Sequence, residues 1–236
     1  MPKRGMKLVC PSPTITLSDC WREAIAEGVG TFILVFAGTG AIMANISNAA
    51  VTHLGISFVF GAVVAALIYC LGHLSGAHFN PAVTLAFWVS GVFPRKRVIP
   101  YMLAQCVGAI AASILLLSLG NVAKLGATLP LNHNWLQSLI LETVLTFILM
   151  LVILGSGIDR RAPIGFAGLA IGLTVGFEAA CMGPITGASM NPVRSLAPAL
   201  VGGNMQYQWV YWLAPITGAQ LAVVMYRLLS NGFKDI

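Results

Sequence analysis

The sequence contains two matching stretches, Gly76-Ala-His-Phe-Asn-Pro-Ala-Val-Thr-Leu-Ala86 and Gly187-Ala-Ser-Met-Asn-Pro-Val-Arg-Ser-Leu-Ala197, which are identical at six of eleven positions. In both, Asn-Pro opens a short apolar segment. Asn is a favoured N-cap and proline fits the first helical turn, so each stretch predicts a helix that begins at Asn-Pro. The two apolar segments, residues 80–90 and 191–201, are too short to cross a bilayer. They therefore predict half-spanning helices.

The composition points to a lipid environment. Only 8% of the 236 residues are charged and 58% are hydrophobic, whereas soluble domains have about 25% charged residues. A soluble fold of this size would lack the polar side chains to cover its surface. The net charge of +6 does not indicate a nucleic-acid partner, because the basic residues lie in short clusters between apolar runs.

Six further segments have the length and polarity of membrane-spanning helices, which need about 20 mostly apolar residues to cross about 30 Å of hydrocarbon. We place them at residues 23–44, 52–73, 98–119, 135–156, 164–183 and 208–229. The sequence thus predicts an all-α membrane protein with six transmembrane helices and two re-entrant half-helices. Residues 1–236 are interpreted as one domain.

The basic residues predict the orientation of these spans. Eleven of the thirteen Lys and Arg residues fall on one side of the predicted arrangement. Lys124 lies in a loop on the opposite side, and Arg194 lies in a loop at membrane depth. The positive-inside rule therefore predicts that both termini are cytoplasmic. We expect a multi-pass protein of the plasma (cell inner) membrane.

The two halves of the chain repeat each other in the same order. Glu27-Gly-Val-Gly-Thr-Phe-Ile-Leu34 matches Glu142-Thr-Val-Leu-Thr-Phe-Ile-Leu149, in addition to the two Asn-Pro stretches. The first repeat covers residues 23–119 and the second covers residues 135–229. Each repeat has three spans, so the second must enter the membrane from the opposite face. Inverted repeats of this kind place the functional site near the bilayer midplane, where interrupted helices meet.

The predicted half-helices would bring two helix N-termini together near the bilayer centre. Each N-terminus carries about half a positive charge, which opposes the passage of cations. Asn80 and Asn191 would offer side-chain N–H groups to a passing oxygen atom. Non-helical backbone at membrane depth is tolerated only where it is buried in protein or lines a wet cavity. We therefore expect a water path lined by the loop carbonyls of Gly76, Ala77, His78, Gly187 and Ser189.

At these loops the chain resembles the aquaporins, also called major intrinsic proteins, and the resemblance extends over residues 23–229. Its two Asn-Pro loops are similar to the paired NPA motifs of that family, here Asn80, Pro81, Ala82 and Asn191, Pro192, Val193. Val193 departs from the usual alanine, which changes only the packing behind the asparagine. The resemblance implies a passive channel for water that excludes protons and ions, has no enzymatic activity or cofactor, and assembles as a homotetramer.

The resemblance also implies a selectivity filter, formed by Phe60, Ala179, Ala188 and Arg194. Family members restricted to water resemble one another in having histidine where Ala179 stands, so the small alanine predicts a wider filter that also admits small neutral solutes. A second group of positions is instead similar to water channels, namely Ser195, Ala199, Tyr211 and Trp212. We interpret the protein as a water channel that passes some small uncharged solutes.

Other buried polar residues have structural or open roles. The resemblance implies that Glu27 and Glu142 support the two loops, and we expect His73 to brace the first of them. No Cys or carboxylate lies at metal-ligand spacing from His73 or His78, so no metal site is predicted. Glu178 is the remaining intramembrane acid, and its position relative to the pore is open.

Three alternative functions remain at this point. The first is the same architecture selecting glycerol, urea, ammonia or an undissociated metalloid acid ahead of water. The second is a proton-coupled secondary transporter, in which Glu178 would carry the proton, since such carriers share inverted repeats and half-helices. The third is an intramembrane hydrolase using Ser75 or Ser189, but the family resemblance accounts for both serines without a nucleophile.

Overall fold

The computed structural model describes residues 17–120 and 125–230, and all the regular elements within these ranges are helices. The six long helices are α1 (Leu17–Asn48), α2 (Thr52–Ser75), α4 (Arg95–Leu119), α5 (Trp135–Ile153), α6 (Ala167–Thr186) and α8 (Val210–Leu229). The two short ones are α3 (Pro81–Ser90) and α7 (Pro192–Val201). A 3-10 turn, η1 (Leu131–His133), precedes α5, and a π-helical turn, η2 (Leu154–Ile158), extends it.

In the part of the chain that is described, six helices are long and apolar enough to cross a membrane. Their outer faces carry large apolar side chains, such as Leu54 and Phe58, which are 71% and 73% exposed. In water these side chains would be unfavourable, whereas lipid tails solvate them. The predicted all-α membrane fold with six spanning helices and two half-helices is confirmed.

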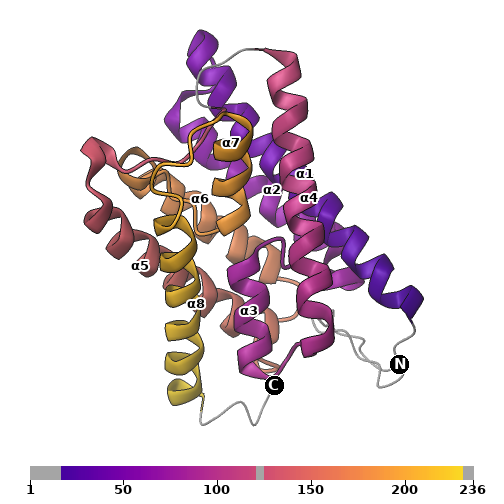
Figure 1. The fold of residues 1–236 in the computed structure, drawn as a ribbon. Helices are drawn as coiled ribbons and strands as arrows, with labels where there is room; N and C mark the ends of the chain where they lie inside the picture. The colour runs from indigo at the N-terminus through magenta and orange to yellow at the C-terminus, as the bar shows by residue number, and fades with distance from the viewer. Residues whose placement is uncertain (1–16, 121–124, 231–236) are drawn as a thin grey trace.

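The long helices pack in equivalent pairs in the two halves, α1 against α4 and α5 against α8, while α2 and α6 join the halves (Figure 1). Glycines allow the closest approaches. A Cβ atom at Gly108 would lie 2.1 Å from the carbonyl oxygen of Gly28, and one at Gly218 would lie 2.2 Å from that of Thr143. Small residues at such crossings let membrane helices approach closely.

The half-helices α3 and α7 lie towards opposite ends of the bundle (Figure 1). Their N-caps, Asn80 and Asn191, have extended backbones, and each side chain accepts a hydrogen bond from a backbone N–H of the first turn. Pro81 and Pro192 occupy the next position. A backbone N–H at this position has no acceptor within the helix, so proline, which lacks an N–H, costs no hydrogen bond there. The N-terminal signals recognised in the sequence thus form both helices as expected.

The predicted boundaries differ from the observed ones by a few residues in each of the six long helices, and most in α1. Helix α1 extends beyond the predicted 23–44 at both ends, because hydropathy detects only the apolar part of a helix. The predicted span 164–183 ends before Pro184, whereas α6 begins at Ala167 and continues through this proline to Thr186. Proline is tolerated inside membrane helices when other groups satisfy the freed carbonyl.

The orientation relative to the membrane remains a prediction. Helix α1 begins and α8 ends at the same end of the bundle (Figure 1), as six spans require. Five of the basic residues that indicate the orientation lie outside the described residues, namely Lys3, Arg4, Lys7, Lys124 and Lys234.

A polar cluster joins the loop after η2 to the end of α8. Asp159 is buried, and its carboxylate accepts hydrogen bonds from Arg161 Nη2 at 2.6 Å and from the Tyr226 hydroxyl at 2.6 Å. The hydrogen bonds from the Arg161 guanidinium, assisted by Tyr226, hold the pKa of Asp159 well below its ordinary value. A carboxylate with a lowered pKa stabilises the folded state above its unfolded-state pKa, and this stabilisation is lost as the pH falls.

We expect Asp159→Asn to lower the melting temperature at pH 7. On acidification, the melting temperature of the variant should fall less than that of the parent. The unfolded-state pKa of aspartate is about 3.9, so the difference between parent and variant should shrink as the pH falls below about 4. Scanning fluorimetry of the detergent-solubilised proteins from pH 7 to pH 3 measures both curves. Tyr226→Phe, which removes one of the donors, should give a smaller shift of the same sign. Parallel curves for parent and Asp159→Asn would contradict this role.

Candidate functional site

A cavity lies between the two halves of the bundle. Its lining includes the four predicted filter side chains, Phe60 from α2, Ala179 from α6, and Ala188 and Arg194 from the second loop and α7. The remaining polar lining comes from the two interrupted segments, Gly76, Ala77, His78, Asn80, Ser189 and Asn191. The inverted repeats thus bring both Asn-Pro segments and all four filter positions to one site.

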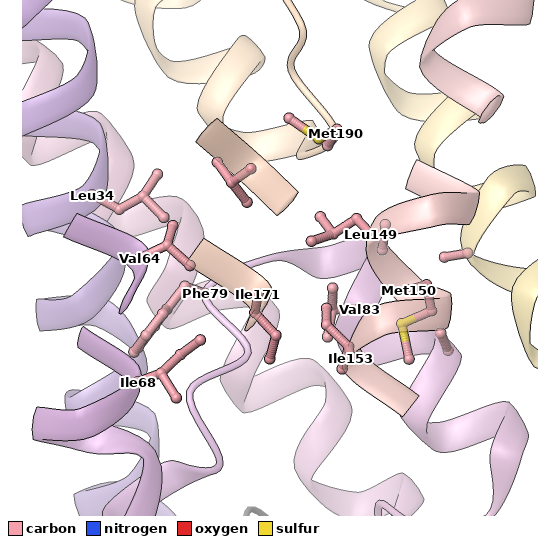
Figure 2. Close-up of a cluster of buried hydrophobic side chains, with 14 of the residues drawn as sticks. Leu34, Val64, Ile68, Phe79, Val83, Leu149, Met150, Ile153, Ile171 and Met190 are labelled. Carbon is pink, nitrogen blue, oxygen red and sulfur yellow. The ribbon is translucent and has the colours of Figure 1, made fainter. Parts of the chain in front are cut away.

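Apolar side chains form the rest of the cavity lining. They come from α1, α2, α3, α5 and α6, and most are labelled in Figure 2: Leu34, Val64, Ile68, Val83, Leu149, Ile153 and Ile171. Phe79 and Met190, one from each loop, also line it and stand at equivalent positions of the two repeats. An apolar lining with a few polar groups gives a solute few places to bind and directs its hydrogen bonds to those groups.

The two loops have the same backbone conformation at equivalent positions. In the first loop φ is 87° at Gly76, 53° at Ala77 and 49° at Phe79, and in the second loop φ is 88° at Gly187, 40° at Ala188 and 53° at Met190. Each non-glycine residue with positive φ costs about 1 kcal/mol or more. This strained backbone therefore requires specific support from the rest of the bundle.

Glu27 of α1 supports the first loop. Its fully buried carboxylate accepts hydrogen bonds from the backbone N–H groups of His78 at 2.9 Å and Phe79 at 2.7 Å. It also accepts from Ser75 Oγ at 2.7 Å and Gln105 Nε2 at 2.8 Å. Each of these bonds satisfies a buried donor that would otherwise be costly.

Glu142 of α5 makes the equivalent contacts with the second loop. Its carboxylate accepts from the backbone N–H groups of Ser189 and Met190, both at 2.8 Å, and from the Thr186 hydroxyl. Tyr211 is fully buried on α8 and donates to the Thr186 carbonyl at 2.6 Å. It is not part of the cavity lining, so it supports the second loop without reaching the cavity.

The structure corrects the role expected for His73. This side chain is exposed at the end of α2 and makes no hydrogen bond among the described residues. Ser75 braces the loop instead, since its hydroxyl donates to Glu27 and accepts from the Ala77 N–H at 3.1 Å. Thr186 does the same in the second half, accepting from the Ala188 N–H at 2.9 Å. The repeated hydroxyl immediately before Gly76 and Gly187 was the sequence signal for these two residues.

The two NPA asparagines link the loops to each other. Asn80 Nδ2 donates to the carbonyl of Met190 at 2.7 Å, and Asn191 Nδ2 donates to the carbonyl of Phe79 at 2.8 Å. An amide nitrogen has two N–H bonds, so each asparagine retains one for a molecule in the cavity. The residues behind them, Pro81, Ala82, Pro192 and Val193, are buried and do not line the cavity.

Arg194 brings a fixed positive charge to the cavity. It is 2% exposed, and its Nη1 donates to the carbonyl of Gly126 at 2.9 Å. Its guanidinium carbon lies 5.1 Å from the centre of the Phe60 ring, within the range of a cation–π contact. Its Nε has no hydrogen-bond partner within the described residues. The guanidinium is thus held in place and keeps a donor unused by the protein.

Gly187, predicted to line the pore, and Glu178, whose position was open, are both absent from the cavity lining. Gly187 caps α6 with a φ of 88°, and a Cβ atom there would lie 2.7 Å from Thr128 Cγ2, so both the helix end and the packing require a glycine. Glu178 is 1% exposed and also absent from the lining, although the next residue, Ala179, belongs to it. Successive helix residues point about 100° apart, which accounts for this difference.

Comparison with known proteins agrees with this geometry. The sequence profile of the family described as "Major intrinsic protein" matches residues 14–226. The chain belongs to the major intrinsic protein family. Its assignment to this family confirms the resemblance seen in the two Asn-Pro loops.

Several named members of the major intrinsic protein family are similar to this chain over most of its length. Aquaporin NIP1-1 of Zea mays is 45% identical over 91% of this chain and 77% of the relative. Nodulin-26 of Glycine max is 44% identical over 91% and 80%. Probable aquaporin AqpM of Archaeoglobus fulgidus is 43% identical over 92% and 99%.

A solved structure of another family member has the same fold. The aquaglyceroporin from Plasmodium falciparum superimposes with a TM-score of 0.76 at 28% identity, covering 87% of this chain and 94% of that one. This major intrinsic protein is therefore an integral, multi-pass membrane protein.

Proposed function

We propose that this major intrinsic protein is a passive transmembrane channel for water and small neutral solutes, and that it excludes protons and other ions. The observation that carries this proposal is the cavity that contains Phe60, Ala179, Ala188 and Arg194 together with both NPA asparagines. Names of its relatives, which include aquaporins and an aquaglyceroporin, support the same function.

Each part of the cavity has a distinct role in this proposal. The carbonyls of Gly76, Ala77, His78 and Ser189 accept hydrogen bonds from a passing solute. Asn80 and Asn191 donate to its oxygen atoms, and the apolar side chains opposite them do not retain it. The positive ends of α3 and α7, together with Arg194, repel cations.

The oligomer and the membrane orientation are part of the same proposal. We propose one channel domain per chain, built from repeats 23–119 and 135–229, with four copies forming a homotetramer. Both termini would be cytoplasmic in the plasma membrane. Family membership supports the tetramer, and the distribution of basic residues supports the orientation.

Stopped-flow light scattering of proteoliposomes tests the channel. Vesicles containing the purified protein are challenged in turn with sucrose, glycerol and urea gradients, and empty vesicles are the control. We expect fast water efflux with a low activation energy, followed by solute entry. Water flux equal to that of empty vesicles would overturn the proposal.

Two small side chains favour passage of solutes larger than water. Ala179 and Ala188 leave the space beside Phe60 and Arg194 open, which supports the alternative of a channel chiefly for glycerol, urea, ammonia or an undissociated metalloid acid. The permeability ratio of glycerol to water separates this alternative from a channel chiefly for water. A proton-coupled carrier is less well supported, because Glu178 does not line the cavity. Solute uptake that depends on an imposed pH gradient would favour the carrier.

We expect Ala179→His to reduce glycerol permeability at least about tenfold, because a few added heavy atoms in a fitted site change solute discrimination by this factor or more. Water permeability should fall much less, since the asparagines and loop carbonyls are unchanged. Both fluxes are measured on proteoliposomes with matched protein content. Ala179→Ser, which adds a single heavy atom, should keep both permeabilities near those of the parent. An equal loss of both fluxes in Ala179→His would show that Ala179 does not set the pore width.

A further inference from the structure

Helix α6 contains a proline within its last turn, close to the filter. In a regular helix the carbonyl of Ala180 accepts the N–H of residue 184. That residue is Pro184, which has no N–H, and its ring pushes the carbonyl of Ala180 outward. The helix therefore leaves the Ala180 carbonyl without its usual donor.

His53 supplies the missing donor from another helix. Its Nε2 lies 2.8 Å from the Ala180 carbonyl oxygen. A carbonyl oxygen only accepts hydrogen bonds, so the imidazole carries its proton on Nε2 and donates it. Gly183 makes room for the ring, because a Cβ atom there would lie 2.9 Å from His53 Cε1.

The contact joins the two helices that carry the proposed filter residues Phe60 and Ala179. Ala180 follows Ala179 directly in α6, while His53 precedes Phe60 by seven residues, or two turns, on α2. The same two helices touch closely about two turns further along, where a Cβ atom at Gly61 would lie 2.6 Å from the carbonyl oxygen of Gly172. The glycine contact lies next to Phe60 in α2, and the His53 contact lies next to Ala179 in α6.

We propose that His53 is a positioning residue of the filter. Its imidazole N–H replaces the helix N–H that Pro184 lacks and holds the backbone of Ala179 and Ala180 against the helix that carries Phe60. The inference rests on the proposed function, because it takes Phe60 and Ala179 as filter residues. It adds a residue that does not touch the solute.

Loss of this hydrogen bond should weaken discrimination by size. Without the imidazole, water binds the Ala180 carbonyl, and the end of α6 moves more freely relative to Phe60. A filter whose sides fluctuate admits a four-carbon polyol more readily than a rigid one. The loss of one net hydrogen bond corresponds to a change of about two- to tenfold in the permeability ratio of erythritol to glycerol.

The test uses four variants of the full chain in proteoliposomes. His53→Phe keeps a ring of similar size and removes the donor, so the ratio of erythritol to glycerol permeability should rise. His53→Gln retains an N–H donor and should keep the parent ratio. Pro184→Ala restores the helix N–H and should also keep it. In the double variant His53→Phe/Pro184→Ala the helix satisfies the Ala180 carbonyl itself, so the ratio should return to that of the parent.

The rescue by Pro184→Ala distinguishes positioning from a general effect on stability. A lower melting temperature in His53→Phe with an unchanged permeability ratio would overturn the inference, and so would a raised ratio that the double variant fails to restore. The water and glycerol permeability of the parent vesicles distinguishes failure of this inference from failure of the proposed function. If the parent vesicles conduct water and glycerol while His53→Phe discriminates as the parent does, the inference alone fails. If the parent vesicles conduct neither, the proposed function fails as well.

Discussion

Arg194→Val is expected to make the protein leak protons and small cations while water still passes. The guanidinium is the charged side chain in the cavity lining, and a unit charge at about 4 Å is worth about 4 kcal/mol at an effective dielectric constant of 20. The dipoles of α3 and α7 remain in the variant, so part of the barrier persists. We expect proton and cation conductance to rise at least about tenfold, since each 1.4 kcal/mol of barrier is a factor of ten.

A pH-sensitive dye enclosed in proteoliposomes measures the proton leak, and stopped-flow scattering measures water in the same preparation. Arg194→Lys keeps the charge and should remain tight to cations. The fold should persist in Arg194→Val, because the main loss is one hydrogen bond to Gly126, worth about 1 kcal/mol. Arg194→Val vesicles as tight as those of the parent would show that the cation barrier lies elsewhere.

Glu142→Leu is expected to abolish water conduction and to destabilise the protein strongly. The change leaves the N–H groups of Ser189 and Met190 and the Thr186 hydroxyl without their acceptor in a buried site. Each unsatisfied buried donor costs about 1–3 kcal/mol, and the left-handed backbone at Ala188 and Met190 loses its support. The total is about 3 kcal/mol or more, enough to open the second loop.

Glu178→Leu is the matched control for this prediction. The carboxyl groups of Glu142 and Glu178 are both buried inside the membrane. The two carboxyl oxygen atoms of Glu178, however, have no hydrogen-bond partner within residues 17–120 and 125–230. Replacing an unpaired buried carboxyl with an apolar side chain of similar volume is neutral or stabilising. We expect unchanged water permeability and an equal or higher melting temperature in detergent. Loss of water flux in Glu178→Leu, or its retention in Glu142→Leu, would contradict the roles assigned to the two glutamates.

The sequence alone predicted the features that depend on local chemistry. Two Asn-Pro pairs identified both half-helices, because N-caps and the first-turn proline act within a few residues of each other. Stretches of about 20 apolar residues identified the six spans, since a bilayer requires each span to be continuous in sequence. Glu27 and Glu142 each open one copy of a repeated eight-residue pattern, which identifies them as equivalent. Each of these signals is a short pattern of residues that are neighbours in the chain, and the repeat is the recurrence of such patterns.

Contacts between distant segments were decided only by the tertiary structure. Asn80 and Asn191 donate to loop carbonyls 110 and 112 residues away, and His53 reaches Ala180 across 127 residues. The continuation of α6 through Pro184 is another such feature, because the donor that compensates for this proline belongs to another helix.

The rotation of each helix about its axis was equally hidden in the sequence. A step of one residue turns a side chain by about 100°, so Ala179 lines the cavity while Glu178 does not. For the same reason Ser75 reaches Glu27 although His73, two residues earlier, is exposed. Composition and spacing determine which segments of the protein enter the membrane and where the two half-helices begin. The packing of the six helices determines which side chains meet at the pore, because it sets the rotation and separation of segments that are far apart in the chain.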